Sequence, residues 1–488
     1  MNINKCKNPK IKKWKMKKQI ILLILLLSTL TFASPLPNNS IVKIFSSIST
    51  PDYKYPWQTS KISNYTGSGA IIKDNMILTS AHVVSSSRFL EVQKENDPKK
   101  YIASVKYISH QADLAIVEVN DKTFFNGTKP LKFNSDIKPR DEITVLGYPF
   151  GGQTISTTKG VISRIEYINY AWSSEYLLAI QVDAAINSGN SGGAAIDNNG
   201  DIVGVAMMRL SNSNNISYIV PSIIVNTFLK DIEDGKVDGF GQDGLLINYI
   251  RNDSVKDYFG LKNDNGVLIT KVEYGIKDFK ENDILLEIDG KTIANDGTIE
   301  SQYGRVNCTL LMHEKQIGET INVKVLRDKK EIAFTYTIER LEPLIKKEFA
   351  KEPRYIIFGG LAFTPLTKNY ISAISTKSNG IEMLFYEKGK TNDFTEPVIW
   401  MQDIFPHKVN RGYQSGAFVV ETVNGEKIKN FTHFVNLIDN LNTEFVVIET
   451  MEKEKIILNV KEAKESFNDL KRIYYLNGDR RLKWKVMT

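Results

Sequence analysis

The 488-residue chain is expected to be mainly β, with one or two β-barrels followed by two smaller α+β modules. Two observations predict this. From residue 41 to residue 218, short apolar or alternating runs are broken by Gly, Asn, Asp and Ser, which is typical of short strands joined by turns. Downstream, residues 283–340 and 417–461 share the order strand, Asp-Gly or Asn-Gly turn, helix and strands, at an offset of 135 residues.

The length predicts about three domains, at about 150 residues for each domain. The first long helical pattern, 221–232, begins with a proline and closes the strand-rich region, and a polar linker follows it. Apolar residues make up 42% of the chain, which is enough for cores that need no disulfide. We expect these segments: 1–33 as a leader, 34–235 as the β-rich domain, 236–342 and 343–465 as the two modules, and 466–488 as a C-terminal tail.

The basic character of the chain lies in its N-terminal leader. The first 33 residues hold eight lysines and no Asp, Glu or Arg, whereas the whole chain has a net charge of +7. Without those lysines the net charge is −1, so charge gives no reason to expect a nucleic-acid partner.

The leader has the pattern of a secretory signal. Its lysines precede an apolar run from Ile20, and the small residues Thr31 and Ala33 predict cleavage after Ala33. We therefore expect an exported protein, periplasmic or extracellular, whose mature form keeps only Cys308 and has no internal disulfide. A retained anchor, leaving the protein membrane-associated, is the alternative, but the apolar run is shorter than the about 20 residues of a spanning helix.

A glycine-rich turn makes Ser191 a candidate nucleophile. It lies in Asn-Ser-Gly-Asn-Ser-Gly-Gly at 187–193, between two strand-like runs. A nucleophilic serine needs a tight exposed turn whose backbone N–H groups face the oxyanion that forms. Gly189 permits backbone conformations closed to other residues, and glycines at 192 and 193 would let the substrate backbone approach. The alternative is a hairpin turn without function.

His82 and Asp113 complete a candidate catalytic set. His82 follows an apolar run, and Asp113 begins another one 31 residues later. Each alone would more often be a buried structural histidine or a turn acid. Together with Ser191, 78 residues further on in the same β-rich domain, they form the set that a Ser/His/Asp mechanism uses.

These strings resemble the trypsin-like HtrA/Deg proteases over residues 64–230. The matching strings are Thr-Ser-Ala-His at 79–82, Ala-Asp-Leu-Ala-Ile at 112–116, Gly-Tyr-Pro-Phe-Gly at 147–151, and the turn at 187–193. The resemblance implies a chymotrypsin-like double β-barrel protease domain with its active site between the barrels. It also implies that the backbone N–H groups of Gly189 and Ser191 form the oxyanion hole.

The rest of the chain resembles the plant-type Deg subgroup, which carries one PDZ domain and a second, divergent one. The supporting strings are 282–290, 293–298 and 360–366; the family more often has Gly where this chain has Asn282. The resemblance implies two α+β PDZ-like domains. In the first domain the candidate carboxylate-binding loop precedes the strand at 266–272, where a peptide would add to the sheet edge. Its residues are Tyr258, Phe259, Gly260 and Leu261. The alternative is a helix end with Gly as its stop signal.

The expected function is that of a secreted serine endopeptidase. The resemblance implies unfolded or damaged protein substrates, an apolar S1 pocket, peptide C-termini as PDZ ligands and a trimer-based homo-oligomer. No metal or other cofactor is expected, because the remaining histidines are scattered and no cysteine pair has ligand spacing. Two alternatives are a chaperone or holdase with a latent protease, and a PDZ scaffold that has lost catalysis. The complete Ser/His/Asp set argues against the scaffold.

Overall fold

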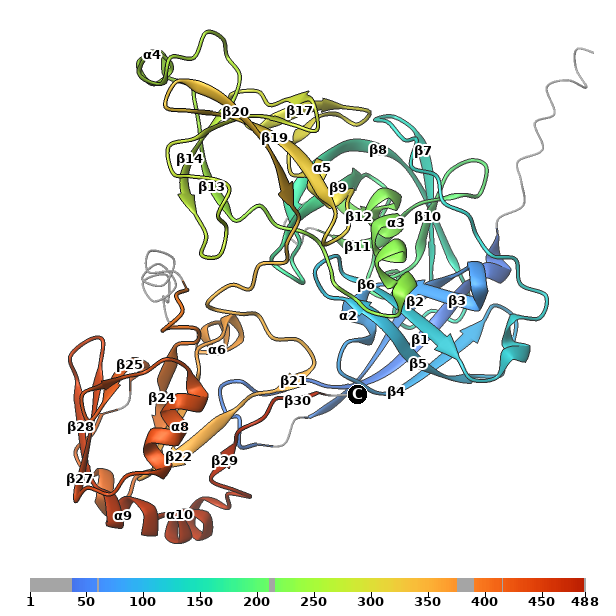
Figure 1. The fold of residues 1–488 in the computed structure, drawn as a ribbon. Coiled ribbons are helices and arrows are strands. Elements are labelled where there is room, and N and C mark those ends of the chain that lie inside the picture. Colours follow the sequence, from blue (N-terminus) through green and yellow to red (C-terminus); the bar gives the residue numbers. More distant parts are fainter. Residues whose placement is uncertain (1–36, 59–60, 210–215, 375–389, 415, 487–488) are drawn as a thin grey trace, which may run out of the picture.

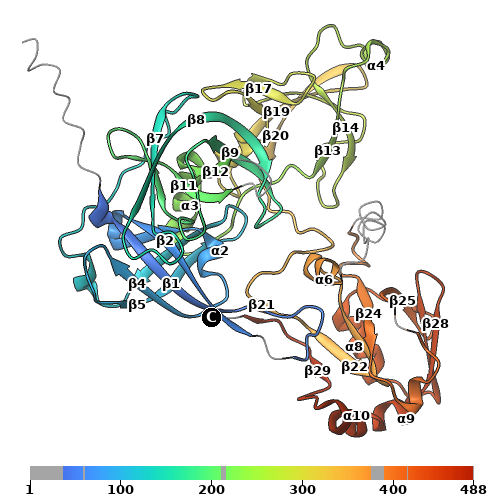
Figure 2. The same cartoon turned by 180° about the vertical axis from the view of Figure 1, so that it is seen from behind.

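The computed structural model describes residues 37–58, 61–209, 216–374, 390–414 and 416–486, which form two closed β-barrels and two further sheets (Figure 1). The expected fold class is confirmed. In Figure 2 the barrels lie side by side, and the two α+β units occupy the other end of the molecule. Among these described residues, no helix is long and apolar enough to cross a membrane.

The first barrel closes in the order β1-β2-β3-β6-β5-β4, and every pair is antiparallel. Alternation along the strands fills its interior with fully buried side chains such as Val42, Ile77 and Val117. One helical turn, α2 (Ala81–Val84), follows β3. The strands are β1 (Ile41–Ser49), β2 (Ile62–Ile72), β3 (Met76–Thr79), β4 (Ser87–Lys94), β5 (Tyr101–Ser109) and β6 (Leu114–Val119).

The second barrel closes in the order β10-β11-β12-β9-β8-β7. Helix α3 (Ser222–Asp231) follows it, close to the segment predicted from sequence. The strands are β7 (Glu142–Gly147), β8 (Ser156–Asn169), β9 (Tyr176–Val182), β10 (Ala194–Ile196), β11 (Ile202–Arg209) and β12 (Ser217–Pro221). Short 3-10 turns lie at Asn38–Ser40, Lys73–Asn75, Lys122–Phe125 and Ile232–Asp234.

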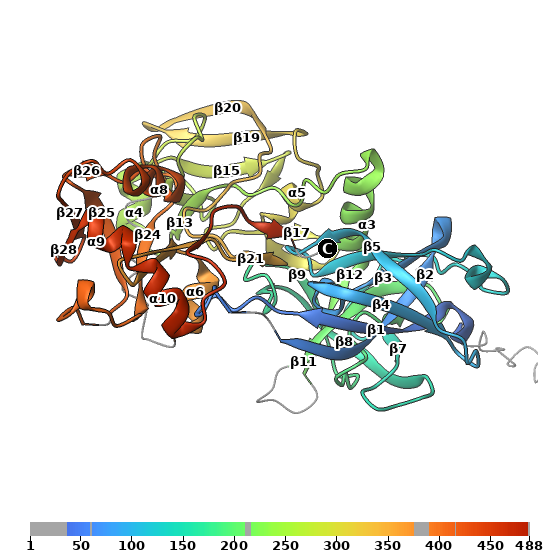
Figure 3. The ribbon, with the colours of Figure 1, turned by 90° about the horizontal axis from the view of Figure 1, so that it is seen from below.

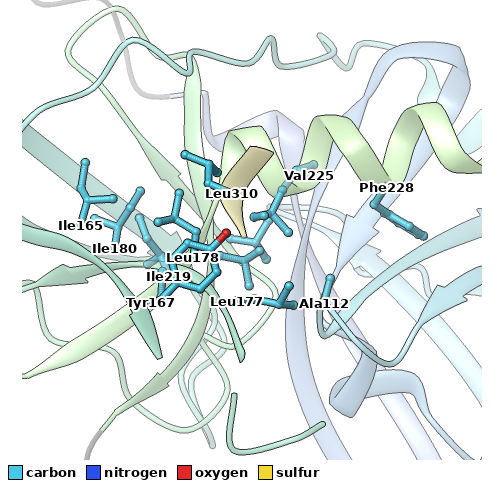
Figure 4. Close-up of a cluster of buried hydrophobic side chains, with 14 of the residues drawn as sticks. Ala112, Ile165, Tyr167, Leu177, Leu178, Ile180, Ile219, Val225, Phe228 and Leu310 are labelled. Atoms are coloured by element: carbon cyan, nitrogen blue, oxygen red, sulfur yellow. The ribbon is translucent and has the colours of Figure 1, made fainter. Parts of the chain in front are cut away.

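The first α+β unit shares a hydrophobic core with the second barrel. Figure 4 shows Leu310 of this unit beside Val225 of α3 and Leu178 of β9. The unit is a sheet in the order β13-β14-β15-β19-β20, with β16 paired to β15. Its elements are β13 (Leu245–Tyr249), α4 (Asp253–Phe259), β14 (Val267–Val272), β15 (Ile284–Ile288), β16 (Lys291–Thr292), β17 (Thr298–Ser301), β18 (Gly304–Asn307), α5 (Leu310–His313), β19 (Thr320–Arg327) and β20 (Lys330–Thr337).

The helix expected after residue 293 is reduced to the single turn α5. The hairpin β17–β18 takes its place, because Ile299 and Val306 face each other as a buried cross-strand pair. Gly304 supplies the positive φ of 85° at the tight turn.

The second α+β unit has its own cores and a sheet in the order β28-β27-β25-β24-β23-β22-β29. Figure 3 shows the helices α9 and α10 and the strands β27 and β28 of this unit away from the barrels, whereas β21 lies beside the barrel strands. Its elements are β21 (Lys351–Glu352), β22 (Tyr355–Phe358), β23 (Leu361–Pro365), α6 (Lys368–Ala373), β24 (Val398–Ile404), a 3-10 turn (Lys408–Asn410), β25 (Phe418–Val423), β26 (Glu426–Lys427), α8 (Phe431–Asp439), β27 (Phe445–Thr450), β28 (Lys455–Asn459), α9 (Val460–Glu465), α10 (Phe467–Tyr474), β29 (Arg480–Arg481) and β30 (Lys485–Val486).

The repeat read from the sequence has a common turn geometry. Asp289 and Asn424 both have positive φ, 45° and 48°, and each precedes a glycine that also has positive φ. In each turn the backbone N–H of this residue donates to a carbonyl of a later strand, and its side-chain oxygen accepts from the N–H of the same strand residue. Asp289 binds the backbone of Asn322 at 2.8 Å, and Asn424 binds that of Val447 at 2.7 and 2.8 Å. Both units therefore use one side chain to fix the tight turn against the sheet.

The segment expected to be a C-terminal tail is folded into the second unit. Leu470 of α10 and Leu476 are buried in its core, and β29 pairs with β22. Strand β30 returns to pair with β21. This segment folds onto the unit because α10 has an apolar face, which is stabilised when it is buried against a core.

Truncating Leu470 should therefore destabilise the second unit. Leu470→Ala is expected to lower its free energy of unfolding by about 2–5 kcal/mol, because the side chain is fully buried. Ile473→Ala on the same helix, where the side chain is 50% exposed, should cost less than about 1 kcal/mol. Urea unfolding followed by circular dichroism measures both. Equal, small effects would mean that the segment behaves as a tail.

Candidate active site

His82 and Asp113 are held together by two hydrogen bonds. His82 lies on α2, and Asp113 lies in the turn between β5 and β6 with a φ of 54°. The His82 ring Nδ1 is 2.7 Å from Asp113 Oδ2, and the His82 backbone N–H donates to Asp113 Oδ1 at 2.9 Å. The carboxylate therefore fixes the ring and leaves Nε2 as the nitrogen that can act on another group.

The environment of this pair raises the pKa of His82. Burial disfavours the charged imidazolium, but the charge of Asp113 and its hydrogen bond outweigh burial, so the pKa lies above the ordinary 6.5. The Asp113 side chain is only 1% exposed, whereas the imidazole is 28% exposed. The ring is therefore the part of the pair that an incoming molecule can reach.

Ser191 sits on a loop clamped between the barrels. Its carbonyl accepts a hydrogen bond from the Ser68 N–H of β2 at 2.9 Å, and the Gly192 N–H donates to Ala206 of β11 at 2.8 Å. Gly67 separates this loop from the His82 helix. A Cβ built on Gly67 would lie 2.4 Å from a methyl of Val83 and 3.3 Å from the Ser191 carbonyl oxygen. The serine loop and the histidine helix thus meet at β2.

The glycines after Ser191 serve packing rather than substrate access. A Cβ on Gly192 would lie 2.3 Å from the Ser68 carbonyl oxygen, and one on Gly193 would lie 2.1 Å from that of Leu146. Both positions face protein backbone, so the expectation that they admit the substrate backbone is wrong. They allow the loop to lie against both barrels.

The peptide between Ser188 and Gly189 has a defined orientation. The Ser188 carbonyl accepts a hydrogen bond from the Phe150 N–H at 2.7 Å. In a trans peptide the carbonyl and the N–H point in opposite directions, so the Gly189 N–H points away from Phe150. Within the described parts of the chain, the N–H groups of Gly189 and Ser191 have no hydrogen-bond acceptor. Both donors are available to an oxygen of a bound molecule.

Sequence reasoning missed Ser68, which is fully buried. Its hydroxyl donates to the Gly189 carbonyl and accepts from the Tyr148 N–H, both at 2.7 Å. It therefore links β2, the serine loop and the Gly-Tyr-Pro-Phe-Gly segment. The one feature of the sequence that could have indicated this role is that Ser68 stands between two glycines, Gly67 and Gly69, in a strand-like run.

His82 and Ser191 are not hydrogen-bonded to each other among the described residues. The Ser191 Oγ instead contacts the Met207 carbonyl at 3.5 Å, which is a weak contact. Hydrogen bonds at such sites are often long without a substrate and shorten in its complex. The Ser191 loop and the helix that carries His82 thus both pack against β2. The Ser191 hydroxyl points toward the Met207 carbonyl.

The expected carboxylate loop at Tyr258 to Leu261 is not supported. Gly260 is the left-handed C-cap of α4, and Leu261 N–H donates to the Lys256 carbonyl at 2.9 Å, so the helix-stop alternative is correct. The strand that follows, β14, pairs with both β13 and β15 and has no free edge. The edge strands of this sheet are β13 and β20, and β13 is the one that lies beside β14; its Leu246 and Tyr249 are 40% and 49% exposed.

Family models match two parts of the chain. The trypsin-like peptidase domain matches residues 67–205, and a PDZ domain matches residues 345–480. The first match covers strands of both barrels, and the second covers most of the second α+β unit.

Curated relatives match most of the chain. The putative mitochondrial protease Do-like 3 of Arabidopsis thaliana is 38% identical over 89% of this chain and 78% of its own length. The mitochondrial protease Do-like 4 of the same plant is 34% identical over 88% and 82%. Its chloroplastic protease Do-like 2 is 32% identical over 84% and 69%.

These relatives correct the expected location. Their names place them in mitochondria or chloroplasts, which points to an organelle, so the expectation of a periplasmic or extracellular protein is wrong. Basic, acid-poor leaders precede both exported and organellar proteins, so the lysines could not distinguish them. The expected signal peptide, 1–33, lies outside the described residues. With its matched peptidase and PDZ regions and these relatives, the chain belongs to the HtrA/Deg (Do-like) family of trypsin-like serine proteases.

Proposed function

We propose that this serine endopeptidase cleaves unfolded or damaged proteins for quality control, with His82, Asp113 and Ser191 as its catalytic triad. The observation that carries the proposal is the double hydrogen bond from His82 to a buried Asp113 beside the Ser191 loop. The quality-control role is inferred from the family, and the geometry of His82 and Asp113 supports the proposed triad.

The proposed chemistry is acyl transfer. The Ser191 Oγ attacks the scissile carbonyl carbon while His82 Nε2 takes the hydroxyl proton, and Asp113 stabilises the imidazolium that results. The carbonyl oxygen becomes an oxyanion that accepts hydrogen bonds from the Gly189 and Ser191 N–H groups. His82 then returns the proton to the leaving amine, and water hydrolyses the acyl-enzyme by the same steps.

A holdase with a latent protease is the alternative. The Ser191 hydroxyl turned toward the Met207 carbonyl favours a resting state that must rearrange before attack. The oriented peptide at Ser188 argues against a collapsed oxyanion site, because the Phe150 N–H already binds its carbonyl, which leaves the Gly189 N–H for an oxyanion. The two functions differ in whether purified protein digests an unfolded substrate.

The protein is also proposed to bind peptides and to assemble with copies of itself. Peptides are proposed to add to the free β13 edge, as PDZ domains bind them, with Leu246 and Tyr249 contacting their apolar side chains. The trimer-based homo-oligomer implied by the family stays a prediction.

Removing the Ser191 hydroxyl should abolish proteolysis. Ser191→Ala is expected to lower casein cleavage by about 10⁴- to 10⁶-fold, because the nucleophile is lost while the loop keeps its backbone bonds. Ser188→Ala, an exposed serine in the same loop, is the matched control and should remain active. The proposal fails if Ser191→Ala cleaves like wild type. Wild type that binds but never cleaves unfolded casein would favour the holdase.

Activity should fall as the solution is acidified. The base is neutral His82, whose pKa is raised above 6.5, so kcat/KM is expected to decline as the pH falls through a value above 6.5. The profile is measured from about pH 5 to 9, the range around the imidazole titration, with circular dichroism at each pH to monitor folding. A midpoint below 6.5 in folded protein would contradict His82 as the base.

Peptide binding should depend on β13 and not on the end of α4. In full-length Ser191→Ala protein, Leu246→Asp should weaken binding of a fluorescent apolar peptide at least about tenfold, because it places a charge on the apolar edge. Tyr258→Ala, at a residue 74% exposed, is the control and should bind normally. Fluorescence anisotropy measures both, with free and C-terminally amidated peptides. Loss of binding only in Tyr258→Ala would restore the α4 loop as the site.

A further inference from the structure

The segment joining the two α+β units, residues 344–352, is firmly attached to the second unit. Leu344 and Ile345 are each 8% exposed and pack in its core. The Lys346 carbonyl accepts from Lys368 of α6 at 2.9 Å, and Glu348 exchanges two backbone bonds with the Asn369 side chain at 2.8 and 2.9 Å. We call residues 344–352 the joining segment (Figure 1).

The same segment contacts the protease domain beside the active site. The Phe349 ring stacks on His110, with centroids 4.3 Å apart and planes at 7°, and lies 5.4 Å from the Trp172 ring. The Lys347 ammonium donates a hydrogen bond to the Trp172 carbonyl. Burial, with a contribution from nearby Lys368, lowers the pKa of Lys347, as expected for a lysine held inside an interface.

His110 and Trp172 are the neighbours of the His82–Asp113 pair. Trp172 is on the turn between β8 and β9, and the centroid of its ring lies 6.2 Å from that of the His82 ring. The His110 carbonyl accepts from the Asp113 N–H at 3.4 Å, in the turn that holds Asp113 at positive φ. Phe349 therefore touches both turns that border the pair, one from each barrel.

A second contact prevents the joining segment from moving freely. The β1–β2 loop places Trp57 against Phe405 of the second unit, with centroids 4.8 Å apart. Tyr53 of this loop donates to the Lys351 carbonyl at 2.9 Å, and Arg481 of β29 donates to the Pro56 carbonyl at 3.0 Å. The second unit is thus attached to the first barrel through the β1–β2 loop as well as through the contact beside the active site.

We propose that Phe349 is a positioning residue for catalysis, which holds the His110 and Trp172 turns so that the His82 ring keeps its orientation. The inference rests on the proposed triad. It assigns the second α+β unit a part in catalysis that is separate from peptide binding. Phe349 itself touches no reacting atom; it acts through Trp172 and His110.

The test compares Phe349→Ala with Phe349→Tyr in the full chain, using a short apolar peptide substrate. Phe349→Ala should lower kcat by about 10- to 100-fold while KM changes less than about threefold, because misplacing a catalytic group affects chemistry more than binding. Phe349→Tyr keeps the ring and should restore most of kcat. Phe445→Ala, a phenylalanine 49% exposed on β27, is the matched control and should remain at wild-type kcat.

Each other outcome has a distinct meaning. Unchanged or increased kcat in Phe349→Ala overturns the inference, and an increase would mean that the contact inhibits. An equal loss of kcat in Phe445→Ala overturns the inference, because it would show that any disruption of the second α+β unit lowers activity. If Phe349→Ala does not fold, Phe349→Leu keeps an apolar side chain but removes the stacked ring, and a kcat lowered about tenfold is expected; no loss overturns the proposal. Activity that persists in Ser191→Ala would instead refute the triad, whatever Phe349 does.

Discussion

The close backbone contact between the two barrels at the Ser191 loop is the constraint on which the site depends. Ser68 of the first barrel binds this loop twice, through its N–H at 2.9 Å and its hydroxyl at 2.7 Å. Such a contact tolerates no side chain at Gly192, where a Cβ would lie 2.3 Å from the Ser68 carbonyl oxygen, and leaves little room at Gly67, where a Cβ would lie 3.3 Å from the Ser191 carbonyl oxygen. The glycines therefore set the distance between the barrels, and that distance sets where the serine stands relative to the histidine helix.

The buried carboxylate of Asp113 adds an electrostatic constraint. A buried charge is costly unless hydrogen bonds satisfy it, and both of its oxygens are bound by His82, one by the ring and one by the backbone. The Ala81 N–H also donates to the Asp113 carbonyl at 3.0 Å. The turn and the helix therefore stabilise each other, and the imidazole orientation follows from the way the fold satisfies this charge.

Two units with the same turn geometry are attached to the protease in different ways. The first continues the core of the second barrel, and its buried His313 is bound to Tyr167 at 3.1 Å. Burial lowers the pKa of His313 to about 4, so it stays neutral near neutral pH and suits this interface. The second keeps separate cores and meets the protease through aromatic contacts of Trp57 and Phe349. One module thus extends the barrel, and the other borders the active site.

The sequence by itself determined the strand-rich class, the two repeated modules and the three candidate catalytic residues, because turns and nucleophile loops impose local glycine patterns. It did not determine the location of the protein, since a basic, acid-poor N-terminal segment is common to several destinations. Only the tertiary structure decided that β13 is an edge strand of its sheet whereas β14 is not, and that residues 466–486 fold back as α10 and β29. It also decided the meeting of Phe349 with His110 and Trp172. Strand order and contacts between distant segments depend on how whole surfaces pack, and no local pattern of residues carries that information.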